Sequence, residues 1–469
     1  MSQDATSPVK ASLVATLLAT RGDVDACRQR LMAAHARAEE VEPWLKAFCH
    51  RRDVATDLAT GSNPNLNDAL KGEPASAAAP STGPFDSAFD LATLASTPLA
   101  GIPVAIKDLM ASADMPTTYG SPIYANHRPT EDAWITARIR EAGGVIFGKT
   151  VTTEFAWREP GPTVNPWNRL HTPGGSSSGS AAAVGAGIVA LATGTQTVGS
   201  VLRPAAFCGV VGYKPSHGKI PTTGVHPLAP TLDHVGFFAT HVEDAALAHA
   251  LFIDRTPEVI ASSAQWNRYF ADGAARAPKR IAVVRTPLWD RVSPEQKANF
   301  ETALQRLRDA GVALVDPHSF DDMPRVLEAV QTLLAVEAAA AIGPATSAAD
   351  PGLLSQHMHT LIAEGKATSD AQYQEALALR SALRASFKGY LNGCDAIVTV
   401  AATGEAPVGL NSTGDPSFCA PWSFLGVPAV TVPSGKAASG MPLGLQVIGD
   451  VGQDLATLQT AAWIENIVR

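Results

Sequence analysis

The sequence predicts an α/β fold around a mostly parallel or mixed β-sheet. Short apolar or alternating runs predict strands, at 101–107, 145–147, 280–284, 396–400, 429–432 and 443–448. Between them lie segments with the periodicity of helices, at 132–142, 181–192 and 371–391. Strands that alternate with helices in this way favour one sheet with helices packed against it. We find no internal repeat and no convincing boundary between two domains.

The first part of the chain differs in composition from the rest. Residues 1–60 predict an N-terminal helical segment packed on the core, and 61–97 a connecting loop rich in Ser, Pro, Ala, Asn and Asp. Residues 98–469 form the predicted core. The apolar run 13–18 has helical spacing and is preceded by an acidic residue and a single lysine. This pattern favours an amphipathic surface helix over a signal peptide.

Charge and cysteine content limit the classes of function. The chain has 469 residues and a formal net charge of −8 at pH 7, which argues against a nucleic-acid partner. Its five cysteines are widely spread without a CxxC pair, a pattern typical of free thiols in a reducing compartment and not of a zinc site. The apolar stretch 181–192 is too short and too rich in glycine to span a bilayer. We therefore expect a cytoplasmic protein without a metal or a membrane partner.

One segment matches a nucleotide-binding motif by its letters alone. Residues 143–150 fit the phosphate-loop pattern GxxxxGK[ST]. A phosphate loop follows a strand and uses its middle residues as a cradle of backbone amides. Here a predicted helix precedes the segment, and its middle residues Val145, Ile146 and Phe147 favour a strand. We interpret the segment as a buried strand with Lys149 near its end.

A second motif indicates an esterase. Residues 175–179 fit GxSxG, which in α/β-hydrolases requires a strand directly before the serine and an acid and a histidine after it. The preceding residues 165–173 contain two prolines and do not predict a strand. Four of the histidines that follow are His217, His226, His234 and His241, and none has a setting that marks it as a base. An α/β-hydrolase esterase is therefore the weaker alternative.

A lysine and two glycine-rich turns support a different serine chemistry. Lys107 ends an apolar strand, where burial would disfavour its charged form. The two turns are 174–180, with serines at 176–178 and 180, and 194–200, with Ser200 at its end. Such turns can direct backbone N–H groups at an oxyanion, and a desolvated lysine can serve as the base for a serine hydroxyl. On local residues alone, Lys107 could equally be an ordinary lysine at a strand end, with serines that cap helices.

Seven segments of the chain together carry a more specific signal. The two richest are Thr172–Ala183 and Gly194–Gly209. The others are Gly101–Asp108, Thr117–Ser121, Thr153–Ala156, Phe418–Ala429 and Met441–Gly449. Taken in chain order, these segments extend from about residue 97 to the C-terminus and resemble the amidase signature family. The separations of 69 residues from Lys107 to Ser176 and 24 from Ser176 to Ser200 are similar to those of its malonamidase-like branch.

The resemblance implies a fold and a catalytic triad. It implies a single large domain with a mixed, twisted sheet covered by helices on both sides, and no cofactor. Lys107 corresponds to the family's lysine, Ser176 to the serine that follows a cis peptide bond, and Ser200 to the nucleophile. The resemblance also implies an oxyanion hole made by the backbone N–H groups of Thr197, Val198, Gly199 and Ser200. It implies supporting roles for Ser177 and Thr195.

Two positions bear on the substrate. The family usually has Gly-Gly-Ser at the nucleophile turn, where this chain has Val198, Gly199 and Ser200. A valine would be strained if the position required a positive φ; we favour the case in which it does not, and the valine narrows the pocket. Arg203 lies three residues after Ser200, the spacing at which an arginine of the malonamidase-like branch binds a substrate carboxylate. A guanidinium suits that task. An internal salt bridge is the alternative role for Arg203.

We therefore expect an amidohydrolase that cleaves a linear amide C–N bond through an acyl-enzyme. A carbamate or an aryl amide could be cleaved by the same triad. Relatives also serve as the amidase component of a tRNA-dependent amidotransferase, which the acidic charge and the unusual turn at Val198 disfavour here. The expected partner is a small-molecule amide or carbamate, and a homodimer stays open. We expect the substrate-binding segments around residues 120–170 and 290–395.

Overall fold

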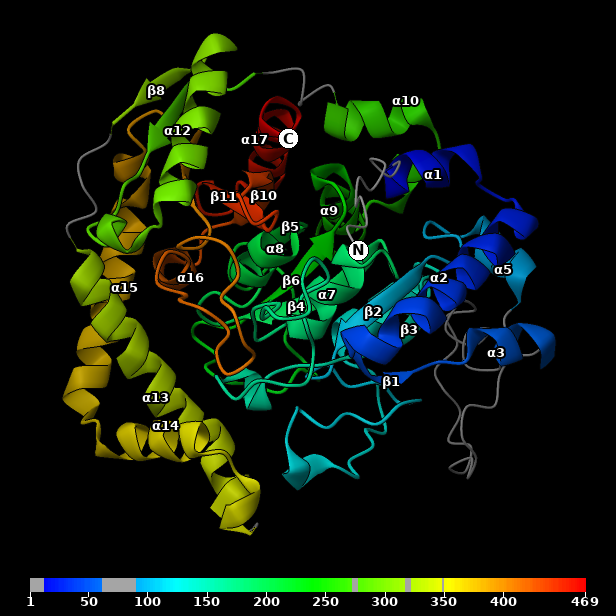
Figure 1. Cartoon of the computed structure of the whole chain (residues 1–469), viewed down its shortest axis with the longest axis horizontal. Coiled ribbons are helices and arrows are strands. Elements are labelled where there is room, and N and C mark those ends of the chain that lie inside the picture. The colour runs from blue at the N-terminus through cyan, green and yellow to red at the C-terminus, as the bar shows by residue number, and fades with distance from the viewer. Residues whose placement is uncertain (1–11, 61–89, 272–276, 317–321, 348–349) are drawn as a thin grey trace.

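Eleven strands form one continuous sheet at the centre of the computed structural model, which describes residues 12–60, 90–271, 277–316, 322–347 and 350–469 (Figure 1). The strands are β1 (Phe48–Arg51), β2 (Pro103–Lys107), β3 (Val145–Thr150), β4 (Leu191–Gln196), β5 (Val211–Lys214), β6 (His234–Ala239), β7 (Arg280–Val283), β8 (Ala313–Val315), β9 (Ala396–Val400), β10 (Ala429–Lys436) and β11 (Pro442–Ile448). Their order across the sheet is β1-β3-β2-β4-β6-β5-β10-β11-β9-β7-β8.

The sheet is mixed, as predicted. β2 runs parallel to β3 and β4, and β7 runs parallel to β8 and β9. The remaining neighbours are antiparallel, including the long pair β10 and β11. The parallel triplet matters for the site because the carboxyl ends of β2 and β4 lie at the same edge of the sheet.

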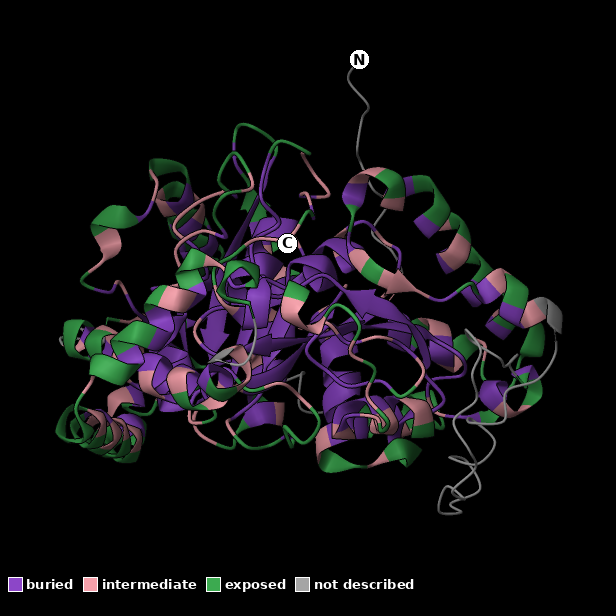
Figure 2. Ribbon diagram, turned by 90° about the horizontal axis from the view of Figure 1, so that it is seen from below, coloured by how far each residue is buried: buried purple, intermediate pink, exposed green. Residues whose placement is uncertain are grey.

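Alternating side chains of the strands enter two different cores, one on each face of the sheet. In β2, Val104 and Ile106 belong to one apolar cluster and Ala105 to another. Helices that pack into the first cluster are α6 (Trp134–Glu141), α9 (Val242–His249), α12 (Pro294–Asp309) and α17 (Asp454–Val468). Helices on the opposite face include α7 (Ser178–Gly185), α8 (Leu202–Cys208) and α16 (Ala420–Leu425). Figure 2 shows the buried sheet between layers that are exposed on their outer sides. The predicted α/β fold with helices on both faces is confirmed.

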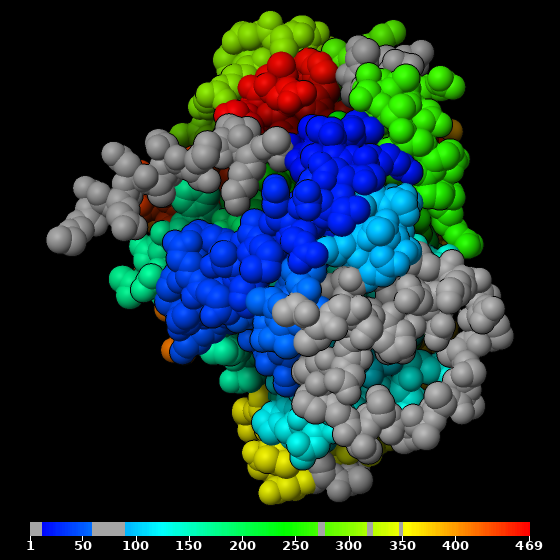
Figure 3. All heavy atoms as spheres, turned by 90° about the vertical axis from the view of Figure 1, so that its right-hand side faces the viewer, coloured from blue at the N-terminus to red at the C-terminus, as the bar shows by residue number. Residues whose placement is uncertain are grey.

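The N-terminal part contributes a strand as well as helices. Its elements are α1 (Leu13–Ala19), α2 (Val24–Leu45), β1, α3 (Val54–Thr60) and α5 (Leu91–Ser96). β1 pairs antiparallel with β3 and so extends the sheet. Figure 3 shows α1 and α2 spread over one side of the molecule, next to the C-terminal helix α17. Most of the predicted connecting loop, residues 61–89, lies outside the described residues, and α5 occupies part of the remainder.

The prediction of a helix over 181–192 was partly wrong. The helix α7 starts earlier and ends at Gly185, and β4 begins at Leu191. The predicted second glycine-rich turn, 194–200, is therefore a strand up to Gln196 and a turn only after it. Every residue of β4 is buried, so the strand lacks the polar–apolar alternation by which a half-buried strand is recognised.

A group of long helices lies beside the sheet. It comprises α13 (Met323–Ser347), α14 (Gln356–Ala367) and α15 (Asp370–Leu391), with the short α10 (Ser263–Trp266) elsewhere on the surface. Within the described residues α13 alone is long and apolar enough to cross a membrane by composition. In this fold α13 packs against α14, α15 and α16, and residues of its N-terminal half line the cavity described below.

Candidate active site

Lys107 is the last residue of β2 and is completely buried. The strand places its amine among hydroxyl groups: Nζ lies 2.7 Å from Ser176 Oγ and 2.7 Å from Thr195 Oγ1. Burial lowers the pKa of Lys107 well below its ordinary value, and the negative charge of Asp233 partly opposes this shift. A neutral amine held against two hydroxyl groups is a suitable proton acceptor.

Ser176 lies in the glycine-rich turn that leads into α7. The peptide bond between Gly175 and Ser176 is cis, as the resemblance implied. A Cβ at Gly175 would lie 2.6 Å from Thr413 Cγ2, so only glycine fits there without a shift. The next residue, Ser177, donates to the carbonyl of Thr195 at 3.1 Å and accepts from its N–H at 3.3 Å. The two predicted supporting residues therefore join the turn at 174–177 to β4.

Ser200 lies in the turn between β4 and α8 and opens onto the same cavity as Ser176. Among the described residues, Ser200 Oγ forms no hydrogen bond to Ser176. Of the two contacts that the predicted relay requires, only the one between Lys107 and Ser176 is present. Such contacts often tighten only when substrate is bound. The backbone N–H groups of residues 197–200 likewise have no acceptor among the described residues. Successive backbone amides without an acceptor are donors of the kind that anion-binding turns use.

Val198 adopts a φ outside the left-handed region. The valine in place of the usual glycine is therefore not strained, and its half-buried side chain lines the cavity. The case without a positive φ therefore holds, and the narrowing of the pocket by the valine stays a prediction.

Gln196 fixes this turn from inside the protein. Its Oε1 accepts from the N–H groups of Val201 at 2.8 Å and Leu202 at 2.9 Å, the first donors of α8. Its Nε2 donates to Ser423 Oγ at 2.9 Å, and Ser423 Oγ donates to the carbonyl of Val198 at 2.8 Å. The sequence analysis did not identify Gln196, although its position inside the segment Gly194–Gly209 was a usable signal.

Asp233 is a second residue that the sequence analysis missed. Its Oδ1 accepts from Thr197 Oγ1 at 2.6 Å, and its Oδ2 accepts from the N–H groups of Leu228 at 2.9 Å and Ala229 at 3.0 Å. Burial raises the pKa of Asp233, and the hydrogen bonds from Thr197, Leu228 and Ala229 oppose this shift. Asp233 therefore ties the turn at 197–200 to the loop before β6 and places a negative charge near Lys107.

Arg203 follows Ser200 by three residues, in the first turn of α8, and is only 4% exposed. Its Nη2 donates to the carbonyl of Gly175 at 2.8 Å and to Thr413 Oγ1 at 3.1 Å. Its Nε and Nη1 have no partner, and it forms no ion pair with any residue that the structure describes. Burial lowers the pKa of Arg203 to about 10, so the group stays protonated at neutral pH. Two free N–H faces on a buried guanidinium suit a bidentate anion.

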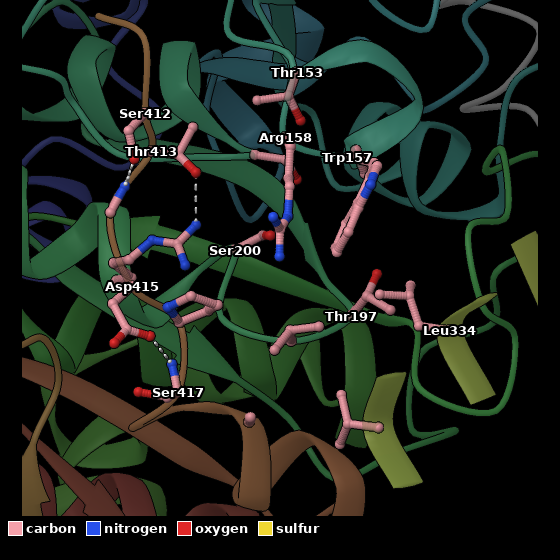
Figure 4. Close-up of a pocket in the computed structure, with 18 of the residues that line it drawn as sticks. Thr153, Trp157, Arg158, Thr197, Ser200, Leu334, Ser412, Thr413, Asp415 and Ser417 are labelled. Atoms are coloured by element: carbon pink, nitrogen blue, oxygen red, sulfur yellow. Dashed lines mark hydrogen bonds between the residues drawn. The ribbon is translucent and has the colours of Figure 1, made fainter. Parts of the chain in front are cut away.

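Ser176, Ser200 and Arg203 share a cavity of about 700 Å³ (Figure 4). This volume is in the range of sites for drug-sized ligands. Trp157 and Arg158 line it from the loop after β3, and the guanidinium of Arg158 lies 4.8 Å from the Trp157 ring centroid. In Figure 4 the Arg158 side chain points into the cavity towards Ser200.

The competing motifs take other roles. Residues 145–150 form the buried strand β3. Lys149 Nζ contacts Met110 O at 2.7 Å, Thr117 Oγ1 at 2.6 Å and Asp108 Oδ1 at 3.0 Å.

None of the four histidines considered for the base of a GxSxG esterase lines the cavity of Ser200. Burial lowers the pKa of one of them, His234, well below its ordinary value. Among the described residues, no three His, Cys, Asp or Glu side chains gather as a metal site would require.

Comparison with known proteins gives matches over nearly the whole chain. The family model described as Amidase matches residues 77–458. A glutamyl-tRNA(Gln) amidotransferase subunit of Synechococcus sp. (strain WH7803) is 31% identical over 475 aligned residues, covering 92% of this chain and 91% of that protein. The solved structure of the peptide amidase PAM with the competitive inhibitor chymostatin is 27% identical, with a TM-score of 0.73 and coverage of 98% and 97%. The structure of 6-aminohexanoate cyclic dimer hydrolase with substrate has a TM-score of 0.79 over 98% of each chain, at 21% identity, and so bears on the fold alone.

Proposed function

The chain belongs to the amidase signature family, whose members act on carbon–nitrogen bonds, and on that premise we propose that it is an amidohydrolase that cleaves a linear amide through Ser200. The observation that carries the proposal is the 2.7 Å contact between the fully buried amine of Lys107 and Ser176 Oγ, beside Ser200 in one cavity. The buried Lys149 is paired with the carboxylate of Asp108, whereas Lys107 contacts two hydroxyl groups and forms no ion pair among the described residues, so it can stay neutral and serve as the base that a serine nucleophile needs.

The proposed reaction starts with two proton transfers. Neutral Lys107 takes the proton of Ser176, which takes the proton of Ser200, while Ser200 Oγ attacks the amide carbonyl. The C–N bond then breaks, and the leaving nitrogen receives the proton back from Lys107 through Ser176. The acyl group is now an ester on Ser200. Water attacks this ester with the same residues as base and acid, and releases the carboxylic acid.

The oxyanion formed in both steps needs hydrogen-bond donors. The N–H groups of residues 197–200 have no acceptor among the described residues, and Thr197, Val198 and Ser200 line the cavity, which supports a role of these amides as donors. Each donor that points at the developing charge contributes about 3 kcal/mol to the stability of the transition state. These donors are fixed before substrate arrives, since Gln196 and Asp233 hold the turn on both sides.

Two substitutions and one trapping experiment test the triad. Ser200→Ala should abolish hydrolysis of small amides, and Lys107→Ala should lower kcat by several orders of magnitude. Ser178→Ala is the matched control, because Ser178 lies in the same serine-rich segment but its Oγ donates to the carbonyl of Val151. Hydroxylamine added during turnover should form a hydroxamate from the acyl-enzyme. Full activity of either triad variant would refute the scheme.

We further propose that Arg203 binds a carboxylate of the substrate. Its two free guanidinium nitrogens are the support, together with the lack of an ion pair among the described residues. Arg203→Met should lower kcat/KM for all amides about tenfold, because the hydrogen bond to Gly175 O next to Ser176 is lost. Amides that bear a carboxylate should lose about a further hundredfold. Equal losses for both kinds of amide would assign Arg203 a structural role only.

Two alternatives use the same residues. A carbamate or aryl amide has a carbonyl that Ser200 can attack in the same way, and a panel of amides, anilides and carbamates ranks them by kcat/KM. The second alternative is a component of an amidotransferase, because the Synechococcus relative carries that name. Turnover of free amides by the purified chain favours the hydrolase, whereas activity that appears only with co-purified partner proteins favours the amidotransferase.

A further inference from the structure

The cavity has two chemically different halves, and the nucleophile lies between them. In Figure 4, Trp157 and Leu334 lie on one side of Ser200, and Thr413, Asp415 and Ser417 lie on the other. Because Ser200 attacks a carbonyl carbon in the proposed function, groups on the two sides of that carbonyl would enter different halves. The composition of the halves therefore contains information on the substrate.

The apolar half is built by one face of α13 and the loop after β3. Leu327, Val330 and Leu334 recur at the spacing of one helix face and all line the cavity. The ring of Trp157 lies on the same side of Ser200 as Leu334 in Figure 4, and the buried Leu228 also lines the cavity. The other residue of α13 at the cavity is Gln331, whose Nε2 donates to Glu364 Oε2 at 2.7 Å, and no acidic or basic side chain of α13 lines the cavity. An apolar surface of this kind gains free energy by covering an apolar ligand group.

The polar half carries an excess of positive charge. Arg203 lines the cavity together with one acid, Asp415, and Arg158 lines it at the boundary with the other half, its guanidinium 4.8 Å from the Trp157 ring centroid. Asp415 is already paired with Arg291 at 3.4 Å and accepts from the N–H of Ser417 at 2.9 Å. Burial, and to a smaller extent the positive charge of Arg158, lowers the pKa of Arg203. An anion beside these two guanidinium groups would offset their charge.

We propose that the half formed by Trp157 and α13 binds an apolar aryl or branched alkyl group, so that the substrate is an amide with a carboxylate on one side of the scissile bond and an apolar group on the other. This inference rests on the proposed function and narrows its substrate class. N-acyl amino acids with an apolar acyl group and anilides of dicarboxylic acids both fit the class. A small amide that carries only the acid would leave most of the 700 Å³ cavity empty.

Four compounds and one pair of matched variants test the substrate class. N-phenylsuccinamate and N-benzoylglycine carry both groups, whereas succinamate lacks the apolar group and acetanilide lacks the acid. We expect the better of the first two to exceed each of the others at least tenfold in kcat/KM. Val330 and Val326 are both buried residues of α13, but only Val330 lines the cavity. Val330→Ala should lower the ratio of kcat/KM for N-phenylsuccinamate to that for succinamate about fivefold to tenfold, and Val326→Ala should leave it unchanged.

A binding measurement separates this inference from the proposed function. In the Ser200→Ala background, calorimetry with N-phenylsuccinamate should give a Kd that Val330→Ala raises about fivefold to tenfold and Val326→Ala does not change. The inference is overturned if Val330→Ala and Val326→Ala have equal effects, or if succinamate is hydrolysed as well as N-phenylsuccinamate. Those results leave the triad intact, whereas hydrolysis by Ser200→Ala would remove the proposed function itself.

Discussion

Replacing Asp233 with asparagine should shift the pH range in which the enzyme works. Asp233 lies outside the triad, yet its negative charge favours the ammonium form of Lys107. Asparagine has the same shape without the charge, so the pKa of Lys107 falls further below its ordinary value. The neutral base then persists to lower pH, and the acidic limb of kcat/KM moves to lower pH.

The cost of this substitution can be worked from the three hydrogen bonds of the carboxylate. In the Asp233→Asn variant, the amide oxygen of the new side chain can still accept from the N–H groups of Leu228 and Ala229, and its amide nitrogen can donate to Thr197 Oγ1. Each bond then changes from charged to neutral and weakens by about 1 kcal/mol, but the change also removes the burial penalty on the carboxylate that raises its pKa, so the free energy of unfolding should fall by less than about 3 kcal/mol. The turn keeps its partner, so we expect the plateau of kcat to fall by about tenfold, less than the loss of an oxyanion donor.

The assay is the dependence of kcat/KM on pH for one simple amide, with urea unfolding of the same samples. Glu337→Gln is the matched control, because Glu337 also accepts two hydrogen bonds, from Thr231 N at 2.8 Å and Tyr373 Oη at 3.0 Å. Glu337 does not appear among the charges that shift Lys107, so this variant should lose stability without a shift of the acidic limb. An acidic limb that stays in place or moves to higher pH in the Asp233 variant would refute the assignment of Lys107 as the base.

Three further predictions concern the same site. Gln196→Leu leaves the buried N–H groups of Val201 and Leu202 without an acceptor, so urea unfolding should show a loss of about 2–6 kcal/mol, and Gln196→Glu should lose less. Burial lowers the pKa of Lys107, so the unfolded chain binds an extra proton between the folded and unfolded pKa values, and the free energy of unfolding rises with pH across that window. Lys107→Met should abolish this rise together with turnover, as urea titrations between about pH 6 and pH 10 would show; an unchanged slope would contradict a neutral lysine. Val198→Gly should cost about 1 kcal/mol of stability, and it should raise kcat/KM for amides with a bulky group next to the carbonyl if the valine limits the pocket.

The parts of the fold that the sequence predicted are those with a local signal. The strand that ends in Lys107 is recognisable because alternating apolar residues follow a glycine, and β3, β7, β9, β10 and β11 are short apolar runs as well. The amphipathic helix α15 has a regular apolar stripe. These signals act over fewer than about twenty residues, which is the range in which periodicity is informative.

The missed parts depend on contacts between distant segments. β4 is buried on both faces and resembles a small-residue helix followed by a turn, although it positions the nucleophile. Asp233 and Gln196 act through partners that only folding brings together, such as Ser423. The cavity walls lie partly in the expected ranges, with Trp157 in 120–170 and Val330 in 290–395. The polar wall at 403–420 was not expected, because nothing local marks its loop.

The antiparallel strand β1 has a consequence for how the protein is made. It forms an outer edge of the sheet, and Phe48 pairs with Thr150, about a hundred residues later in the chain. On the ribosome, β1 therefore leaves the exit tunnel well before its neighbour exists. A shortened version that starts after β1 would leave β3, with its apolar residues 145–147, as an exposed rim that can recruit other chains. Such a version should aggregate even though every residue of the triad is retained.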